Sequence, residues 1–238
     1  AALAAALAKV QADQPAEAQT SVSMELHIEE IFEEMIDGEV LFALAYRDPV
    51  TRLIRPPLSV TEGARVYLKL VNKTRRPRRF AITGFAQDAF PAIAAGATGT
   101  VSFIAPTAGS YIYHETTEGG GGRLVGLHGP LVVKPLDGRT AAGTRTPYAT
   151  PTVAQSALLD ALGVNRRFPG DPWRPDLPER NLIWMFAEID PALNRQVERN
   201  LPVDWTSWVA KITPRYFTIN GVSGLDASHD ESVQPVGY

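Results

Sequence analysis

The sequence predicts an all-β protein organised around an antiparallel β-sandwich. Three short runs rich in β-branched and aromatic residues read as strands, at residues 100–104, 110–114 and 131–133. Proline and glycine separate these runs, including the consecutive glycines at 119–122, as expected of turns between strands. None of these runs is long enough to form a well-packed helix.

The residues before this stretch continue the strand pattern. Residues 24–32 and 40–46 are expected to be strands, with a hairpin turn at Asp37-Gly38 between them. Residues 64–71 alternate apolar and polar side chains most cleanly, which indicates a half-buried strand. Residues 80–83 are the next expected strand.

The later part of the sequence predicts a mixture of helix, extended connection and strand. Residues 153–162 predict a short helix, with Thr152 as its N-cap and Gly163 as its C-cap. A proline-rich, extended connection comes next. Residues 181–189 and 211–220 are again apolar and predict two further strands.

Composition narrows the classes of function. The chain has 238 residues, enough to bury a sizeable core, and a net charge of −3, so we expect no nucleic-acid partner. It has no cysteine, which excludes disulfides, thiolate metal ligands and thiol nucleophiles. No apolar run reaches eighteen residues, so no membrane span is expected.

The beginning of the sequence suggests export. Residues 1–8 are almost all alanine and precede a polar stretch, which resembles the start of a mature protein after cleavage by signal peptidase. We therefore expect a periplasmic or secreted protein. A start left by trimming a longer sequence is equally consistent with the same residues.

A group of arginines lies in the turn before residues 80–83. Its members are Arg75, Arg76, Arg78 and Arg79. The expected role is an ordinary solvated loop, and the alternative is docking to an acidic partner or to anionic lipid.

Several motifs together resemble the cupredoxin domains of multicopper oxidases and copper nitrite reductases. The family pattern has an aromatic-x-Tyr-His strand, a Gly-x-x-Gly loop and a closing strand that ends in Val-x-Pro. The matching residues are Ala108-Gly109 and residues 111–114, 126–129 and 131–135. Further matches begin at Trp184 and at Tyr216, so the resemblance covers most of the chain from about Met24 onward.

The resemblance implies a fold and a division of the chain. The fold is a cupredoxin-like Greek-key β-sandwich, followed by the opening strands of a second, incomplete sandwich. The expected segments are an Ala-rich N-terminal segment at 1–23, a cupredoxin-like domain at 24–138, a linker with a short helix at 139–180, and the start of a second cupredoxin-like domain at 181–238. A whole sandwich needs about 100 residues, so a further domain or a second polypeptide is expected to complete the fold.

The metal ligands of the family are mostly missing. A blue copper site needs two histidines and a cysteine, usually with a weak axial methionine. The position of the cysteine is Glu115 here, and that of the methionine is Leu127. The oxygen- or nitrite-binding copper of the family uses separate histidine pairs. The first pair, expected just after residues 80–83, is absent, and in the second set only His114 matches a copper ligand by position.

The remaining metal hypothesis is a mononuclear site. His114 and His128, with Glu115 or Glu118, contain the ligand types that hold copper, zinc or non-haem iron. The alternative is that each histidine is a structural residue held by hydrogen bonds.

Three functions are consistent with these observations. The first is the N-terminal portion or subunit of a multicopper-oxidase-like copper oxidoreductase, with any copper held mainly outside this chain. The second is a copper-free cupredoxin-like protein that binds or assembles other molecules outside the cytoplasm. The third is a mononuclear metal enzyme at His114 and His128. The resemblance also allows a homo-oligomer.

Overall fold

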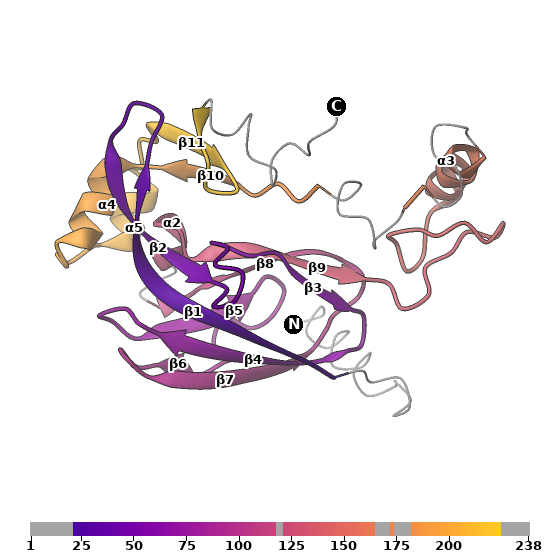
Figure 1. The fold of residues 1–238 in the computed structure, drawn as a ribbon, viewed down its shortest axis with the longest axis horizontal. Helices are drawn as coiled ribbons and strands as arrows, with labels where there is room; N and C mark the ends of the chain where they lie inside the picture. The colour runs from indigo at the N-terminus through magenta and orange to yellow at the C-terminus, as the bar shows by residue number, and fades with distance from the viewer. Residues whose placement is uncertain (1–20, 118–120, 165–171, 174–181, 225–238) are drawn as a thin grey trace.

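Two facing β-sheets form the body of the protein (Figure 1). The computed structural model describes residues 21–117, 121–164, 172–173 and 182–224. The first sheet has the strand order β2-β1-β4-β7, and the second has the order β3-β9-β8-β5-β6. The prediction of an all-β sandwich is confirmed.

The strands of the first sheet are β1 (Ser21–Glu34), β2 (Val40–Arg47), β4 (Arg65–Asn72) and β7 (Thr98–Ile104). The strands of the second sheet are β3 (Leu58–Thr61), β5 (Arg78–Ile82), β6 (Ala92–Ile93), β8 (Gly109–Glu115) and β9 (His128–Lys134). Each predicted strand of this region is present. Neighbouring strands are antiparallel except for the pairs β1–β4 and β3–β9, which are parallel.

The core lies between the two sheets and is set by the alternation along each strand. Along β4, Val66, Leu68 and Leu70 are buried while Tyr67 and Lys69 are exposed, as the sequence predicts. On the facing sheet, aromatic rings fill the space: Tyr113 packs edge-on against Tyr46, with ring centroids 5.2 Å apart, and stacks on Phe80.

The long β1–β2 hairpin reaches beyond the sandwich to the C-terminal segment (Figure 1). Met35 and Leu41 of the hairpin form a second, small core with Ile189 and Tyr216. The Tyr216 hydroxyl donates to Asp37 at the hairpin tip, with an oxygen–oxygen distance of 2.8 Å. The hairpin thus supports the segment that comes after the linker.

That C-terminal segment contains both predicted strands, in shorter form, and two helices that were not predicted. The strands β10 (Phe186–Ile189) and β11 (Tyr216–Ile219) form a separate antiparallel pair. Between them lie α4 (Pro191–Glu198) and α5 (Trp205–Val209). Asp190 caps α4 by accepting from the backbone N–H groups of Ala192 and Leu193, with proline in the first turn.

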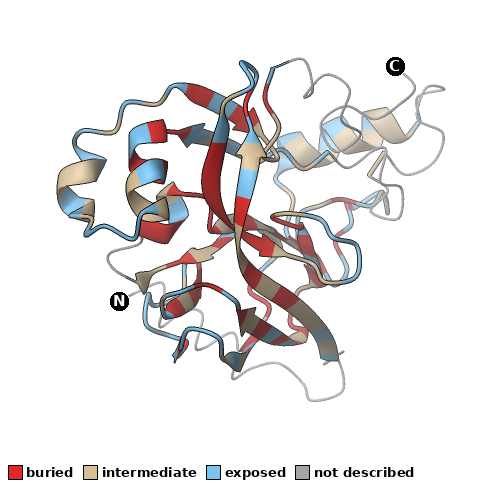
Figure 2. Ribbon diagram, turned by 60° about the vertical axis from the view of Figure 1, so that its left-hand side comes forward, coloured by how far each residue is buried: buried red, intermediate tan, exposed pale blue. Residues whose placement is uncertain are grey.

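Two more helices complete the described structure. Helix α2 (Gly121–Leu124) is a single turn within the glycine-rich loop. Helix α3 (Val153–Gly163) begins at Thr152, as predicted, through a capping box with Gln155, and it buries no side chain (Figure 2). Its C-cap is Val164, one residue beyond the predicted Gly163. No helix in the described residues is long and apolar enough to cross a membrane.

The arginine loop is not simply solvated, contrary to the expected role. Arg75 donates to the backbone oxygen of Glu198 at 3.1 Å, and Arg76 donates to the side-chain oxygen of Asn200 at 2.7 Å. These acceptors lie at and just after the C-terminal end of α4, where cations are favourable. The loop therefore fastens the C-terminal segment to the sandwich.

Asn72 at the end of β4 holds this loop in place, which gives a first prediction. Its buried amide donates to the backbone oxygens of Arg76 and Ile93, and its oxygen accepts from the Thr74 N–H. Asn72→Ala removes these three hydrogen bonds from a buried site, so we expect the free energy of unfolding to fall by roughly 2–4 kcal/mol in urea titrations.

The matched control is Lys69→Ala, on the same strand, which removes an exposed ion pair with Glu25. It should change stability by less than about 1 kcal/mol. Equal effects of the two substitutions would contradict the role given to Asn72.

Candidate functional site

The predicted site residues lie where β8 and β9 run side by side. His114 and His128 are direct partners in the antiparallel register, so their side chains project from the same face of the sheet. This face points away from the main core, whereas Tyr113 and Glu115 point into it. The structure thus brings the two histidines together as cross-strand neighbours.

Both imidazole rings have one nitrogen fixed by a backbone carbonyl. The Nδ1 atom of His114 lies 3.2 Å from the oxygen of Glu115, and that of His128 lies 3.0 Å from the oxygen of Arg123. Because a carbonyl oxygen only accepts, each Nδ1 carries the proton and each Nε2 has a free lone pair. Burial lowers the pKa of His114, and burial together with Arg55 lowers the pKa of His128 to about 4, so both rings are neutral near pH 7.

A neutral imidazole held in this way is suited to binding a metal through Nε2, but the described residues do not complete a site. They contain no group of three or more histidine, cysteine, aspartate or glutamate side chains able to hold an ion. Glu115 is turned into the core, and Glu118 lies outside the described residues. The role of the histidine pair as metal ligands therefore stays a prediction.

Glu115 takes a structural role at the position where the family pattern has cysteine. Its carboxylate accepts hydrogen bonds from the Thr117 N–H and hydroxyl and, at 3.1 Å, from the Gly122 N–H. Burial raises the pKa of Glu115 to about 7, although Arg78 and the N–H donors favour the ionised form. The carboxylate thus ties α2 to the end of β8.

The glycine-rich loop is shaped by this contact, a role that sequence reasoning missed. A Cβ atom added at Gly122 would lie 2.4 Å from a Glu115 oxygen, and one at Gly121 would overlap the Trp205 ring. Consecutive glycines a few residues after an acid at the end of a predicted strand are the signal that could have indicated such close packing. Leu127, at the axial methionine position, is fully buried in the main core.

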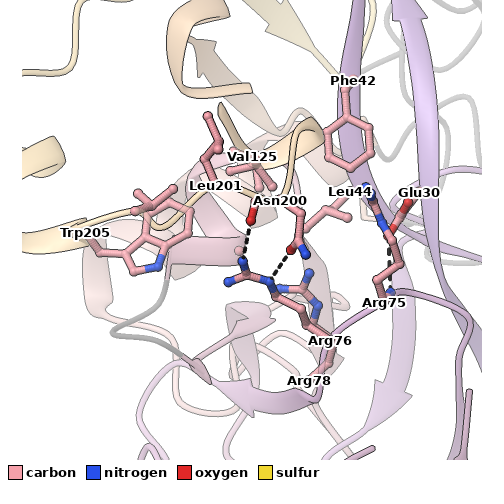
Figure 3. Close-up of a pocket in the computed structure, with 13 residues that line it drawn as sticks. Glu30, Phe42, Leu44, Arg75, Arg76, Arg78, Val125, Asn200, Leu201 and Trp205 are labelled. Carbon is pink, nitrogen blue, oxygen red and sulfur yellow. Dashed lines mark hydrogen bonds and ion pairs between the residues drawn. The ribbon is translucent and has the colours of Figure 1, made fainter. Parts of the chain in front are cut away.

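A second feature is the hollow beneath the arginine loop (Figure 3). Arg75, Arg76 and Arg78 line it from one side, and Asn200, Leu201 and Trp205 are among the residues on the other. Its volume is about 20 Å³, which is room for about one water molecule. The hollow therefore has no room for an organic substrate, and the arginines beside it connect the sandwich to the C-terminal segment.

The fold and the site define a class: a cupredoxin-like β-sandwich with no cysteine and, among the described residues, no group of side chains able to hold a metal ion. Residues 51–138 match the family model of the multicopper oxidases. The resemblance predicted from the motifs is thus confirmed over these residues. No curated protein matches the chain.

Solved structures show the same fold. A copper nitrite reductase from Nitrosomonas europaea is 18% identical, with a TM-score of 0.57 over 90% of this chain and 62% of that one. A blue copper oxidase from the same organism is 18% identical, with a TM-score of 0.56 over 85% of this chain and 54% of that one. The multicopper oxidase mgLAC, also 18% identical, gives a TM-score of 0.53 over 85% and 54%. The chain thus spans somewhat more than half the length of these proteins.

The buried carboxyl group predicts a specific pH dependence of stability. The folded-state pKa of about 7 lies above the ordinary value of 4.5, so the folded protein keeps a proton that the unfolded chain loses as pH rises. The stability of the wild type should therefore fall by roughly 2–3 kcal/mol, relative to Glu115→Gln, between pH 5 and pH 8.

Urea titrations of both proteins across this range measure the difference. Glu62→Gln, in the turn between β3 and β4, is the control and should track the wild type. If the wild type and Glu115→Gln differ by the same amount at all pH values, Glu115 does not retain a proton in the folded state.

Proposed function

We propose that this chain is the N-terminal portion of a multicopper-oxidase-like copper oxidoreductase and that its sandwich serves as a scaffold without a blue copper. The observation that carries the proposal is the family match over residues 51–138 combined with the replacement of the cysteine by the buried Glu115. Copper, in this proposal, is held mainly outside the chain, and no electron-transfer step is assigned to these residues.

The β10–β11 pair supports the idea that a further unit completes the fold. One face of this pair packs on the hairpin through Ile189 and Tyr216. On the opposite face, Phe186 and Phe217 are 67% and 64% exposed, and Trp184 lies just before them. An isolated two-stranded sheet is marginally stable, and a large exposed aromatic face favours an added layer.

We propose that a further cupredoxin domain, or a second polypeptide, supplies this layer. Comparison with solved structures supports this view, since the chain covers 62% of the copper nitrite reductase chain and 54% of the blue copper oxidase chain. A location in the periplasm or outside the cell is part of the same proposal. It draws its support from the resemblance to the multicopper oxidase family.

The second candidate function is a copper-free cupredoxin-like protein for binding or assembly outside the cytoplasm. The Glu115 carboxylate favours this second candidate. It stands at the position of the cysteine ligand in the family pattern, and it already accepts a hydrogen bond from the backbone N–H of Gly122. The two candidates differ in whether a copper-bearing unit accompanies this domain.

Metal analysis of the protein, purified with everything that accompanies it, separates these candidates. We expect the chain alone to show no intense blue absorption with Cu²⁺, because it has no thiolate, while the accompanied protein contains copper. Elemental analysis, visible spectra and the intact masses of all components provide the measurement. A blue centre formed by this polypeptide alone would contradict the proposal, and a copper-free complete assembly would favour the second candidate.

The aromatic face predicts the effect of a surface substitution. Phe217→Ser should weaken association with the completing domain or polypeptide, measured by size-exclusion chromatography of the mixed components, while the urea midpoint of the chain alone stays nearly unchanged. The control is Val153→Ser, which changes an 89%-exposed side chain on α3. Equal association of both variants would show that the partner does not bind this face.

The histidine pair supplies a separate prediction. If His114 and His128 hold a metal, Cu²⁺ or Zn²⁺ should bind the folded chain with one-to-one stoichiometry, and His114→Ala should lose this binding. Calorimetric titration measures it, with His27→Ala on β1 as the control. Retention of binding in His114→Ala would exclude this third function.

A further inference from the structure

A small polar cavity lies at the junction between the sandwich and the C-terminal segment. Its walls include Glu33 of β1, Arg55, His128 of β9, Asn194 of α4 and Thr218 of β11. The cavity has a volume of about 20 Å³. Two of its side chains contain buried polar atoms that have no hydrogen-bond partner among the described residues, the Nε2 atom of His128 and the Oδ1 atom of Asn194.

The chemistry of the histidine atom is fixed by the rest of its ring. The Nδ1 atom of His128 donates to the carbonyl oxygen of Arg123 at 3.0 Å, which leaves Nε2 as a hydrogen-bond acceptor. His114, its neighbour across the strands, is not among the residues that line the cavity. The free nitrogens of the two rings therefore have different surroundings.

The chemistry of the asparagine atom is fixed in the same way. The Nδ2 atom of Asn194 donates to the backbone oxygen of Phe42 at 2.7 Å. This bond sets the orientation of the amide, because the reverse orientation would place two oxygens against each other. The Oδ1 atom is therefore an acceptor as well.

Two acceptors cannot satisfy each other, and leaving both of them unpaired in a buried site would destabilise the fold. A species that donates two hydrogen bonds would satisfy both. A cavity of about 20 Å³ holds one water-sized species and no more.

The local charge decides between a water molecule and a cation. Arg55 lines the cavity, and its guanidinium forms a two-pronged ion pair with Glu33, with nitrogen–oxygen distances of 2.7 and 3.0 Å. Glu188 also lines the cavity, but the described residues contain no group of three or more histidine, cysteine, aspartate or glutamate side chains able to hold an ion. A neutral donor is therefore favoured over a divalent metal ion.

We propose that His128 and Asn194 bind a single buried water molecule that joins β9 to α4. This water links β9 of the sandwich to α4 of the C-terminal segment. The two side-chain atoms that it joins, Nε2 of His128 and Oδ1 of Asn194, form no direct hydrogen bond with each other. It also donates a hydrogen bond to Nε2 of His128, the atom through which this ring would have to bind a metal. The proposal is independent of the proposed function, since it concerns only described residues of this chain.

Nuclear magnetic resonance of the whole chain, with nitrogen-15-labelled histidine, tests the first step. We expect His128 to be the Nδ1–H tautomer at pH 7, with Nε2 unprotonated yet hydrogen-bonded. Observation of the Nε2–H tautomer, which makes Nε2 a donor, would overturn the proposal. Added Zn²⁺ should leave the His128 resonances unchanged, and a stoichiometric shift of them would establish a metal site in place of the water.

Magnetic relaxation dispersion, which counts long-lived internal waters, tests the second step. We expect one fewer such water in His128→Leu than in the wild type and no change in the matched variant His114→Leu. An unchanged count in folded His128→Leu would overturn the proposal. If His128→Leu does not fold, a high-resolution crystal structure of the wild type decides: density for a water within hydrogen-bond distance of both atoms supports the site, and its absence refutes it.

Discussion

The pairing of β1 with two different strands is the constraint on which the rest of the structure depends. Its first half, from Ser21, pairs in parallel with β4, while its second half, to Glu34, pairs with β2 in an antiparallel hairpin. Because β4 pairs only with the first half of β1, the second half of β1 projects beyond the sandwich. The hairpin formed there supplies Met35 and Leu41, the apolar surface on which Ile189 of β10 and Tyr216 of β11 pack, so the hairpin belongs to both parts of the molecule.

The glycine-rich loop is held in shape by one buried side chain. The Glu115 carboxylate accepts hydrogen bonds from the backbone N–H groups of Thr117 and Gly122. These bonds hold the α2 turn against β8, and the N–H of Leu44 of β2 extends the connection by donating to the oxygen of Val125. Hydrogen bonds and close packing thus fix the described part of the loop.

Sequence reasoning recovered the sandwich because its signals are local. The alternation along β4 and the turn residues around β8 specify strands whatever the rest of the chain does. The His114–His128 pairing was also within reach, since both residues belong to motifs that resemble neighbouring strands of one fold. Their role as metal ligands stays a prediction, because the described residues contain no group of three or more ligand side chains able to hold an ion.

Other features depend on long-range contacts that no local pattern contains. Arg75 and Arg76 looked like a solvated loop, but their acceptors lie more than 100 positions later in the sequence, at Glu198 and Asn200. The cavity at Asn194 likewise requires β9, β11 and α4 to meet. Helix α4 was not predicted, although Asp190 followed by proline is a helix-start signal. These residues come directly after a predicted strand and also match a family motif, which favoured a strand-rich interpretation of the segment.

The contact between Glu115 and Gly122 has an evolutionary consequence. A mutation that placed cysteine at position 115 would remove the carboxylate that accepts from the Gly122 N–H and anchors α2. A side chain at position 122 would in turn overlap this carboxylate, so a change at either position affects the other. Related sequences that share this contact should therefore retain the carboxylate and the glycine together.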